Sequence, residues 1–167
     1  ASELENVTIT HLYTEGYADY VLPQYAGHFH LDSFFIGGNV RKATQNGYAD
    51  YIPCSLSDTA RIIREGHQPV NGVFIMVSEP DEEGYVSLGT SVDCTLAAIE
   101  RADYVIAQVN CHMPFCYGDA RIPMSKITAW VRHDVPLAEA EFPPLSEQDI
   151  AIGRHAAALI PDGATLQ

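Results

Sequence analysis

The continuous apolar run at Gly72–Val77, and the run at Tyr104–Val109 that only Gln108 interrupts, constrain the fold of this chain most strongly. A strand with one face in water alternates apolar and polar residues, whereas a strand covered on both faces is apolar throughout. Residues 91–101 lie between the two runs and have the apolar spacing of a helix. A helix between two such strands is typical of an α/β fold with parallel strands.

The rest of the chain continues this alternation. Further strands are predicted at residues 4–12, 33–36, 50–53, 85–88 and 127–131, and further helices at 40–47, 59–65 and 147–159. We therefore predict an α/β fold with an open, mostly parallel sheet and flanking helices. Residues 34–36, 73–77 and 104–109 are expected to be central strands of that one sheet.

Composition limits the possible partners. With 167 residues, of which 47% are apolar, the chain has room for one globular domain with a core. Nine basic residues against 22 acidic residues give a formal net charge of −13. A surface of this charge repels nucleic acid and anionic lipid, so neither is an expected partner. It also repels a polyanionic ligand unless local donors hold that ligand.

No apolar stretch approaches the ~20 residues that a membrane-spanning helix needs. We therefore expect no membrane partner and a soluble, cytoplasmic protein, in which the four cysteines are reduced. The ends of the chain suggest part of a longer protein, because a predicted strand begins at residue 4 without a capping sequence before it. Residues 136–144 are predicted to be a linker, followed by a helix that Ser146 caps.

Gly37, Gly38 and Asn39 follow the predicted strand at 34–36 and precede a helix that Asn39 can cap. Glycines let the backbone approach a ligand closely, and N–H groups at the start of a helix have no partner within the helix. Ligands of open α/β sheets lie at the carboxyl ends of strands. The three residues are therefore predicted to bind substrate by donating to an oxyanion or phosphate. The alternative is a glycine pair that only forms a tight turn.

Gln108 and Asn110 occupy the corresponding place at the end of the 104–109 run. Uncharged amides at this place can bind a substrate carboxylate or carbonyl without a shifted pKa. Both residues are therefore predicted to bind substrate.

Cys111, His112, Cys116 and Asp119 lie close together in the sequence, as ligands of zinc can do. Their spacing is not one of the usual paired-cysteine forms and no second pair follows, so no metal site is predicted. A cysteine nucleophile with His112 or His133 as its base stays open, although nothing in the sequence fixes such a pair.

Two other polar groups have simpler interpretations. Four carboxylates crowd the predicted turn at residues 79–83, where solvated charges are common. His28 and His30 alternate, so a strand would place both rings on one face. That face would be either a site or a half-buried surface.

These motifs, taken in order, resemble the acetyl-CoA hydrolase/transferase family, and within it the 4-hydroxybutyrate CoA-transferases. The resemblance is carried by residues 26–29, 33–43, 49–51, 81–89, 91–93, 97–100, 105–110, 113–114, 118–119, 123–127, 151–155 and 163–167. It covers nearly the whole chain but only the amino-terminal half of the family's length. It implies that residues 1–167 are a partial amino-terminal CoA-transferase domain, without the family's first strand and helix and without its carboxyl-terminal catalytic domain.

The resemblance also implies the chemistry. Family members move CoA between a short-chain acyl-CoA, such as 4-hydroxybutyryl-CoA or butyryl-CoA, and acetate through a glutamyl-CoA thioester. The nucleophilic glutamate is expected beyond Gln167, so no catalytic residue is expected in this chain, which alone should be inactive. Acyl-CoA hydrolysis is one alternative, and a non-catalytic split subunit or binding module is another.

The same resemblance implies the ligands and partners. The expected ligands are coenzyme A, as a substrate, and a small carboxylate, and no permanently bound cofactor is expected. The expected protein partners are the remaining half of the enzyme and further copies in a homodimer or higher homo-oligomer. Gly37, Gly38 and Asn39 would donate to developing negative charge. Gln108 and Asn110 would orient the carboxylate.

The chain departs from the family in the loop after Asn110. Cys111 stands where the family has a proline, and Phe115 where it has an arginine. The missing cation weakens any anion contact at this loop, and Arg121 is the residue close enough in sequence to replace it.

Overall fold

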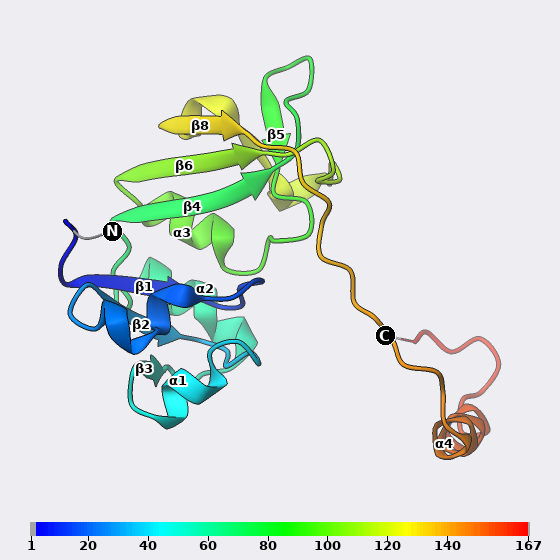
Figure 1. The fold of residues 1–167 in the computed structure, drawn as a ribbon. Helices are drawn as coiled ribbons and strands as arrows, with labels where there is room; N and C mark the ends of the chain where they lie inside the picture. Colours follow the sequence, from blue (N-terminus) through cyan, green and yellow to red (C-terminus); the bar gives the residue numbers. More distant parts are fainter. Residues whose placement is uncertain (1–2, 167) are drawn as a thin grey trace. The chain divides into compact units, whose positions relative to one another are not determined.

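The computed structural model describes residues 3–166 of the chain. The chain divides into two units, Ala1–Leu137 and Ala138–Gln167, and each unit is described by itself. The first unit contains the strands and three α-helices, and the described part of the second contains one α-helix (Figure 1).

The first sheet of this unit is parallel, with the order β1-β2-β3. Its strands are β1 (Val7–His11), β2 (Phe29–Ser33) and β3 (Ala49–Tyr51). The connections are the 3₁₀ turns η1 (Asp19–Val21) and η2 (Pro23–Tyr25) before β2, and the helix α1 (Arg41–Gln45) after it. Leu31 of β2 is buried with Val21, Val40, Ala43 and Ala49, so the connections supply the core of this sheet.

The second sheet is also parallel, with the order β4-β6-β8. Its strands are β4 (Gly72–Val77), β6 (Tyr104–Val109) and β8 (Ala129–Arg132). The helix α2 (Leu56–Arg64) precedes β4, and α3 (Thr95–Arg101) precedes β6 (Figure 1). Val77, Ala107 and Ile99 of α3 share one buried cluster, whereas Phe74 of β4 is 77% exposed. The two faces of β4 were expected to be buried, and the exposed Phe74 shows that one face is only partly covered.

A third, two-stranded sheet pairs β5 (Tyr85–Ser87) with β7 (Arg121–Pro123) in the antiparallel direction. The 3₁₀ turns η3 (Gly118–Ala120) and η4 (Met124–Lys126) flank β7. Val86 and Ile122 belong to the same buried cluster as Val77 of β4. The third sheet therefore shares its core with the second sheet.

The predicted fold class is confirmed, because both three-stranded sheets are parallel and their strands alternate with helices. The prediction of one sheet that contains residues 34–36, 73–77 and 104–109 is wrong. β2 ends at Ser33, whose Oγ donates to the backbone oxygen of Phe35 at 2.6 Å in a local turn. Phe34 is then buried against helix residues such as Ile63. A strand and a packed turn can bury the same apolar run, so the pattern alone did not separate them.

The second unit contains α4 (Glu147–Ala157), which confirms the helix predicted at 147–159. Ser146 Oγ accepts from the Asp149 N–H at 3.1 Å, and the Asp149 carboxylate accepts from the Ser146 N–H at 2.9 Å. This reciprocal capping box begins the helix as predicted. Residues 136–144 form no helix or strand, and the boundary between the units lies among them. Within residues 3–166, no helix combines the length and apolar character needed to cross a membrane.

Candidate functional site

Gly37, Gly38 and Asn39, here called the glycine turn, follow β2 at the carboxyl edge of the first sheet. Gly37 is buried, and a Cβ at this position would lie 3.1 Å from the Tyr13 ring. Gly38 is exposed, and a Cβ there would meet nothing within 4 Å. Among residues 3–166, no hydrogen bond uses the backbone N–H of any of the three. These three N–H groups therefore have no hydrogen-bond partner among the described residues.

Asn39 does not cap the following helix, contrary to the prediction. The N-cap residue of α1 is Val40, and no side chain caps this helix. Asn39 Nδ2 instead donates to the backbone oxygens of Thr14 at 2.9 Å and Gly16 at 3.1 Å. These bonds hold the segment after β1 against the turn after β2, so the side chain fixes the shape of the glycine turn.

Gln108 and Asn110 lie at the carboxyl edge of the second sheet. Gln108 is partly buried, and its Nε2 donates to the backbone oxygen of His133 at 2.8 Å. Asn110 is fully buried. Its Nδ2 donates to the Val135 oxygen at 2.8 Å, and its Oδ1 accepts from the N–H groups of Val135 at 3.2 Å and His112 at 3.1 Å. The amide of Asn110 therefore fixes the segment that follows β8.

The predicted site residues thus form two groups, one at each parallel sheet. Within the described residues, no hydrogen bond joins the glycine turn to Gln108 or Asn110. The first group offers unused backbone donors. In the second group, both polar atoms of the Asn110 amide already bind the chain.

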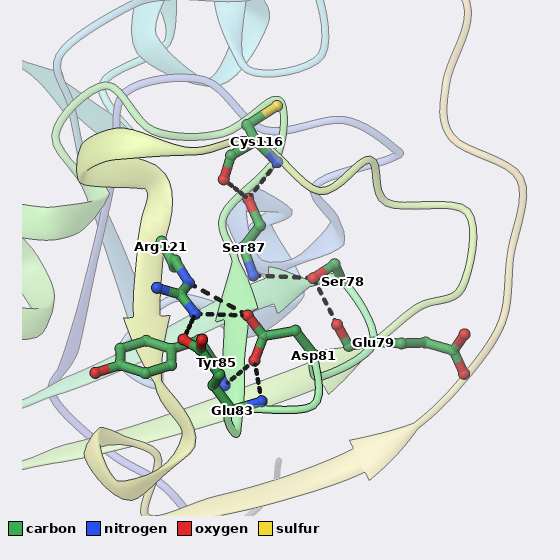
Figure 2. A network of polar contacts seen from close by, with 8 residues as sticks. All are labelled: Ser78, Glu79, Asp81, Glu83, Tyr85, Ser87, Cys116 and Arg121. Atoms are coloured by element: carbon green, nitrogen blue, oxygen red, sulfur yellow. Dashed lines mark hydrogen bonds and ion pairs between the residues drawn. The ribbon is translucent and has the colours of Figure 1, made fainter.

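Ser87 of β5, in the third sheet, organises a further set of polar contacts that sequence reasoning missed. It is fully buried on β5, and its Oγ accepts from the Cys116 N–H at 2.8 Å (Figure 2). The same Oγ accepts from the Gly89 N–H at 3.1 Å. Gly89 has a φ of +56°, and a Cβ there would lie 2.3 Å from Met113 Sδ. The loop at residues 111–117 is therefore held closely against β5. The available signal was a serine in an apolar strand, since a buried hydroxyl requires partners.

Asp81 organises the turn between β4 and β5 (Figure 2). Its carboxylate accepts from the N–H groups of Tyr85 at 2.8 Å and Glu83 at 3.0 Å, and it pairs with Arg121 at 2.8 Å. The Tyr85 N–H, followed by Arg121, holds the pKa of Asp81 below its usual value. Asp81 is therefore a structural residue of this turn, which the prediction of solvated charges missed.

Arg121 belongs to the same turn. Its guanidinium pairs with Glu83 and Asp81 and lies 4.0 Å from the centre of the Tyr85 ring. Glu83, followed by Asp81, raises the pKa of Arg121. Arg121 therefore uses Nε and Nη2 in the turn between β4 and β5, and its replacement of the cation that is missing at Phe115 stays a prediction.

Two of the cysteines are poor nucleophiles. Burial, with Asp93 adding to the effect, raises the pKa of the Cys94 thiol to about 12. Desolvation and the neighbouring Asp134 carboxylate also raise the pKa of Cys111. The thiolate is the reactive form of cysteine, so both environments oppose reactivity. No hydrogen bond in the described part of the chain joins a cysteine to His112 or His133.

His28 and His30 do not act as a pair. His28 precedes β2, and its Nδ1 lies 2.6 Å from the backbone oxygen of Leu4. His30 lies within β2, beside Asp32 and Asp50. The alternating histidines therefore belong to two different environments.

The sequence that forms these sheets matches a known protein family. Residues 1–139 match the acetyl-CoA hydrolase/transferase N-terminal domain. The chain belongs to this family.

Two similar proteins are named as CoA transferases. The chain is 41% identical over 168 residues to a succinyl-CoA:acetate/propanoyl-CoA:succinate CoA transferase of Fasciola hepatica, covering 100% of this chain and 35% of that protein. It is 42% identical over 159 residues to a 4-hydroxybutyrate coenzyme A transferase of Clostridium kluyveri, covering 95% and 37%. The chain thus spans about a third of the length of these relatives.

Solved structures agree on the fold. RipA from Yersinia pestis superposes with a TM-score of 0.89 at 24% identity, over 98% of this chain and 40% of RipA, and this likeness shows the fold alone. A 4-hydroxybutyrate CoA-transferase from Porphyromonas gingivalis has a TM-score of 0.67 at 35% identity, over 83% of this chain and 36% of its own.

Proposed function

We propose that the protein to which this chain belongs is a CoA-transferase that moves CoA between a short-chain acyl-CoA and acetate. Candidate acyl donors are 4-hydroxybutyryl-CoA and butyryl-CoA. The observation that carries the proposal is the identity of more than 40% to two proteins named as CoA transferases. The chain aligns with both over nearly its whole length.

The proposed reaction uses a glutamate outside these 167 residues. Its carboxylate attacks the thioester carbonyl, the C–S bond breaks, and CoA thiolate leaves a mixed anhydride. The thiolate then attacks the glutamyl carbonyl and releases the first carboxylate. Acetate attacks the glutamyl thioester in turn, and the returning thiolate forms acetyl-CoA and frees the glutamate. This covalent route divides one acyl transfer into easier steps.

Within this scheme, the chain supplies part of the substrate site. The free N–H groups of Gly37, Gly38 and Asn39 donate to the oxygen on which negative charge develops. Gln108 orients the acceptor carboxylate. Asn110 contributes by holding the segment at Val135, since its own amide is already hydrogen-bonded. CoA is a substrate here, and the complete enzyme is proposed to be a cytoplasmic homo-oligomer.

A test with the complete protein separates this function from hydrolysis. A transferase forms acetyl-CoA from butyryl-CoA only when acetate is present, whereas a hydrolase releases free CoA thiol without acetate. The difference depends on how well the site excludes water. A protein that does neither with butyryl-CoA or 4-hydroxybutyryl-CoA fits a non-catalytic subunit or binding module and contradicts the proposal.

Trapping locates the nucleophile. Borohydride or hydroxylamine treatment after mixing with acyl-CoA should modify a glutamate outside residues 1–167, and these 167 residues alone should not become acylated. Modification of Glu79 or Glu100 would overturn this assignment.

A further inference from the structure

His30, Asp32 and Asp50 gather on neighbouring strands of the first sheet. Asp32 of β2 and Asp50 of β3 are partners in the strand register. His30 Nε2 lies 3.0 Å from an Asp50 carboxylate oxygen and 3.4 Å from Asp32 Oδ1. The three ligand atoms all lie within 4.8 Å of one another. Two adjacent strands therefore direct one imidazole nitrogen and two carboxylate oxygens to the same point.

The separations suit a small divalent metal ion. Zinc binds histidine nitrogen and carboxylate oxygen at about 2.0–2.2 Å, so ligand atoms in a tetrahedral site lie roughly 3.3–3.5 Å apart. The two separations from His30, 3.0 and 3.4 Å, are close to that spacing, and the two carboxylate oxygens lie within 4.8 Å of each other. Three protein ligands also leave a fourth position for water, as in open zinc sites.

A buried side chain orients one of the carboxylates. Gln68 is 9% exposed, and its Nε2 donates to Thr10 Oγ1 at 2.8 Å and to Asp32 Oδ2 at 3.3 Å. Because Gln68 binds one oxygen of Asp32, the other oxygen is the one that faces His30. Carboxylates that ligate metals usually have such a hydrogen-bonded partner behind them.

The net negative charge of the group also favours the binding of a cation. Asp32 and Asp50 are partners in the parallel register of β2 and β3, so their two like charges lie close together and repel each other. In the described part of the chain, neither carboxylate pairs with a lysine or an arginine, and His30 carries at most one positive charge. The group therefore keeps negative charge that a divalent ion would neutralise.

We propose that His30, Asp32 and Asp50 bind one divalent ion of the zinc class, with Gln68 as a positioning residue. The bound ion joins β2 to β3 and removes the repulsion between the two carboxylates. This inference is independent of the proposed transferase activity.

Calorimetric titration of the full-length protein with zinc chloride tests the site. A Cys111→Ser background removes the exposed thiol, which could bind zinc by itself. In this background, His30→Ala should lose one equivalent of zinc or lower its affinity at least tenfold. Gln68→Ala should lower the affinity about tenfold, as changes behind metal ligands do.

His67→Ala is the matched control, because this exposed histidine lies beside a carboxylate, Glu65, at 3.3 Å and outside the proposed site. Its zinc binding should equal that of the background protein. If His30→Ala does not fold, Asp50→Asn at the exposed β3 position provides the same test. Absence of zinc binding in the background protein, or zinc binding that His30→Ala and Asp50→Asn leave unchanged, would overturn the proposal.

Discussion

The two carboxyl edges of this chain use their polar groups in opposite ways. At the first sheet, the glycine turn leaves three backbone N–H groups without partners in the described chain. At the second sheet, and in the turn and third sheet that follow β4, Asn110, Asp81 and Ser87 bind neighbouring loops through nearly every polar atom. The first edge therefore keeps unused donors, as the proposed substrate site requires, and the polar groups of the second edge hold neighbouring loops in place.

The difference follows from residue type. Glycine gives close access to backbone donors without placing a side chain over them. A buried amide or carboxylate is stable only if partners satisfy it, so such residues at the second edge recruit the nearest loop. Substitutions in the glycine turn should therefore change activity, and substitutions of Asn110, Asp81 and Ser87 should mainly change stability.

The largest expected effect is that of Gly38→Val in the complete enzyme. The new side chain meets no protein atom near its Cβ, and Gly38 does not need a positive φ, so the protein should fold normally. The valine side chain should obstruct the approach of the acyl oxygen to the free N–H groups and lower kcat by ~10²-fold or more. CoA exchange assays measure kcat, and thermal melting measures whether the variant keeps its stability.

Gly153→Val is the control for Gly38→Val, because Gly153 of α4 also has open space around it and lies in the other unit. It should keep full activity. A Gly38→Val enzyme that folds normally and retains full turnover would show that the glycine pair is only a turn.

Asn110→Ala should have the largest effect on stability. It removes the partners of the Val135 N–H and oxygen and of the His112 N–H. Unsatisfied buried groups of this kind cost about 2–3 kcal/mol of unfolding free energy. Asn39→Ala, which loses two bonds at a more exposed place, should cost about 1 kcal/mol. Urea unfolding measures the loss of unfolding free energy in each variant. Equal losses would contradict the view that polar side chains hold the second edge more strongly than the first.

The sequence predicted the second sheet better than the first. Its runs at Gly72–Val77 and Tyr104–Val109 match β4 and β6, because long apolar runs there are paired strands. The run at 34–36 failed because Phe34 is buried by helices after the strand has ended. The contacts of Ser87 with Cys116 and of His30 with Asp50 join residues 29 and 20 positions apart, so no local pattern contains them.

Gln108→Ala should have a smaller effect than Asn110→Ala on stability. Only one hydrogen bond, to the His133 oxygen, is lost at a partly exposed position, which costs at most about 1 kcal/mol. If Gln108 orients the acceptor, the KM for acetate should rise roughly tenfold, as expected for one hydrogen bond to a charged group, with little change in kcat. An unchanged KM for acetate would show that Gln108, like Asn110, has only a structural role.

The smallest expected effect is a change in how stability depends on pH. The pKa of Asp81 is held below its usual value, chiefly by the Tyr85 N–H and then by Arg121. A carboxyl group with a lowered folded-state pKa stabilises the protein above its unfolded-state pKa, and this stabilisation is lost as the pH falls through the folded-state value. Asp81→Asn should therefore lower stability near neutral pH and reduce its decline below about pH 4. Fluorescence of Trp130, the single tryptophan, can follow urea unfolding of the second sheet.

Some of that decline should remain in Asp81→Asn, since the Cys111 N–H, followed by Arg132, also lowers the pKa of Asp134. Asp149→Asn provides the control, because the pKa of Asp149 is lowered by Ser146 within the other unit. It should leave the Trp130 transition unchanged. If Asp81→Asn and the unmodified protein decline equally between about pH 5 and pH 3, Asp81 does not stabilise the second edge through its charge, and only its neutral hydrogen bonds hold the turn.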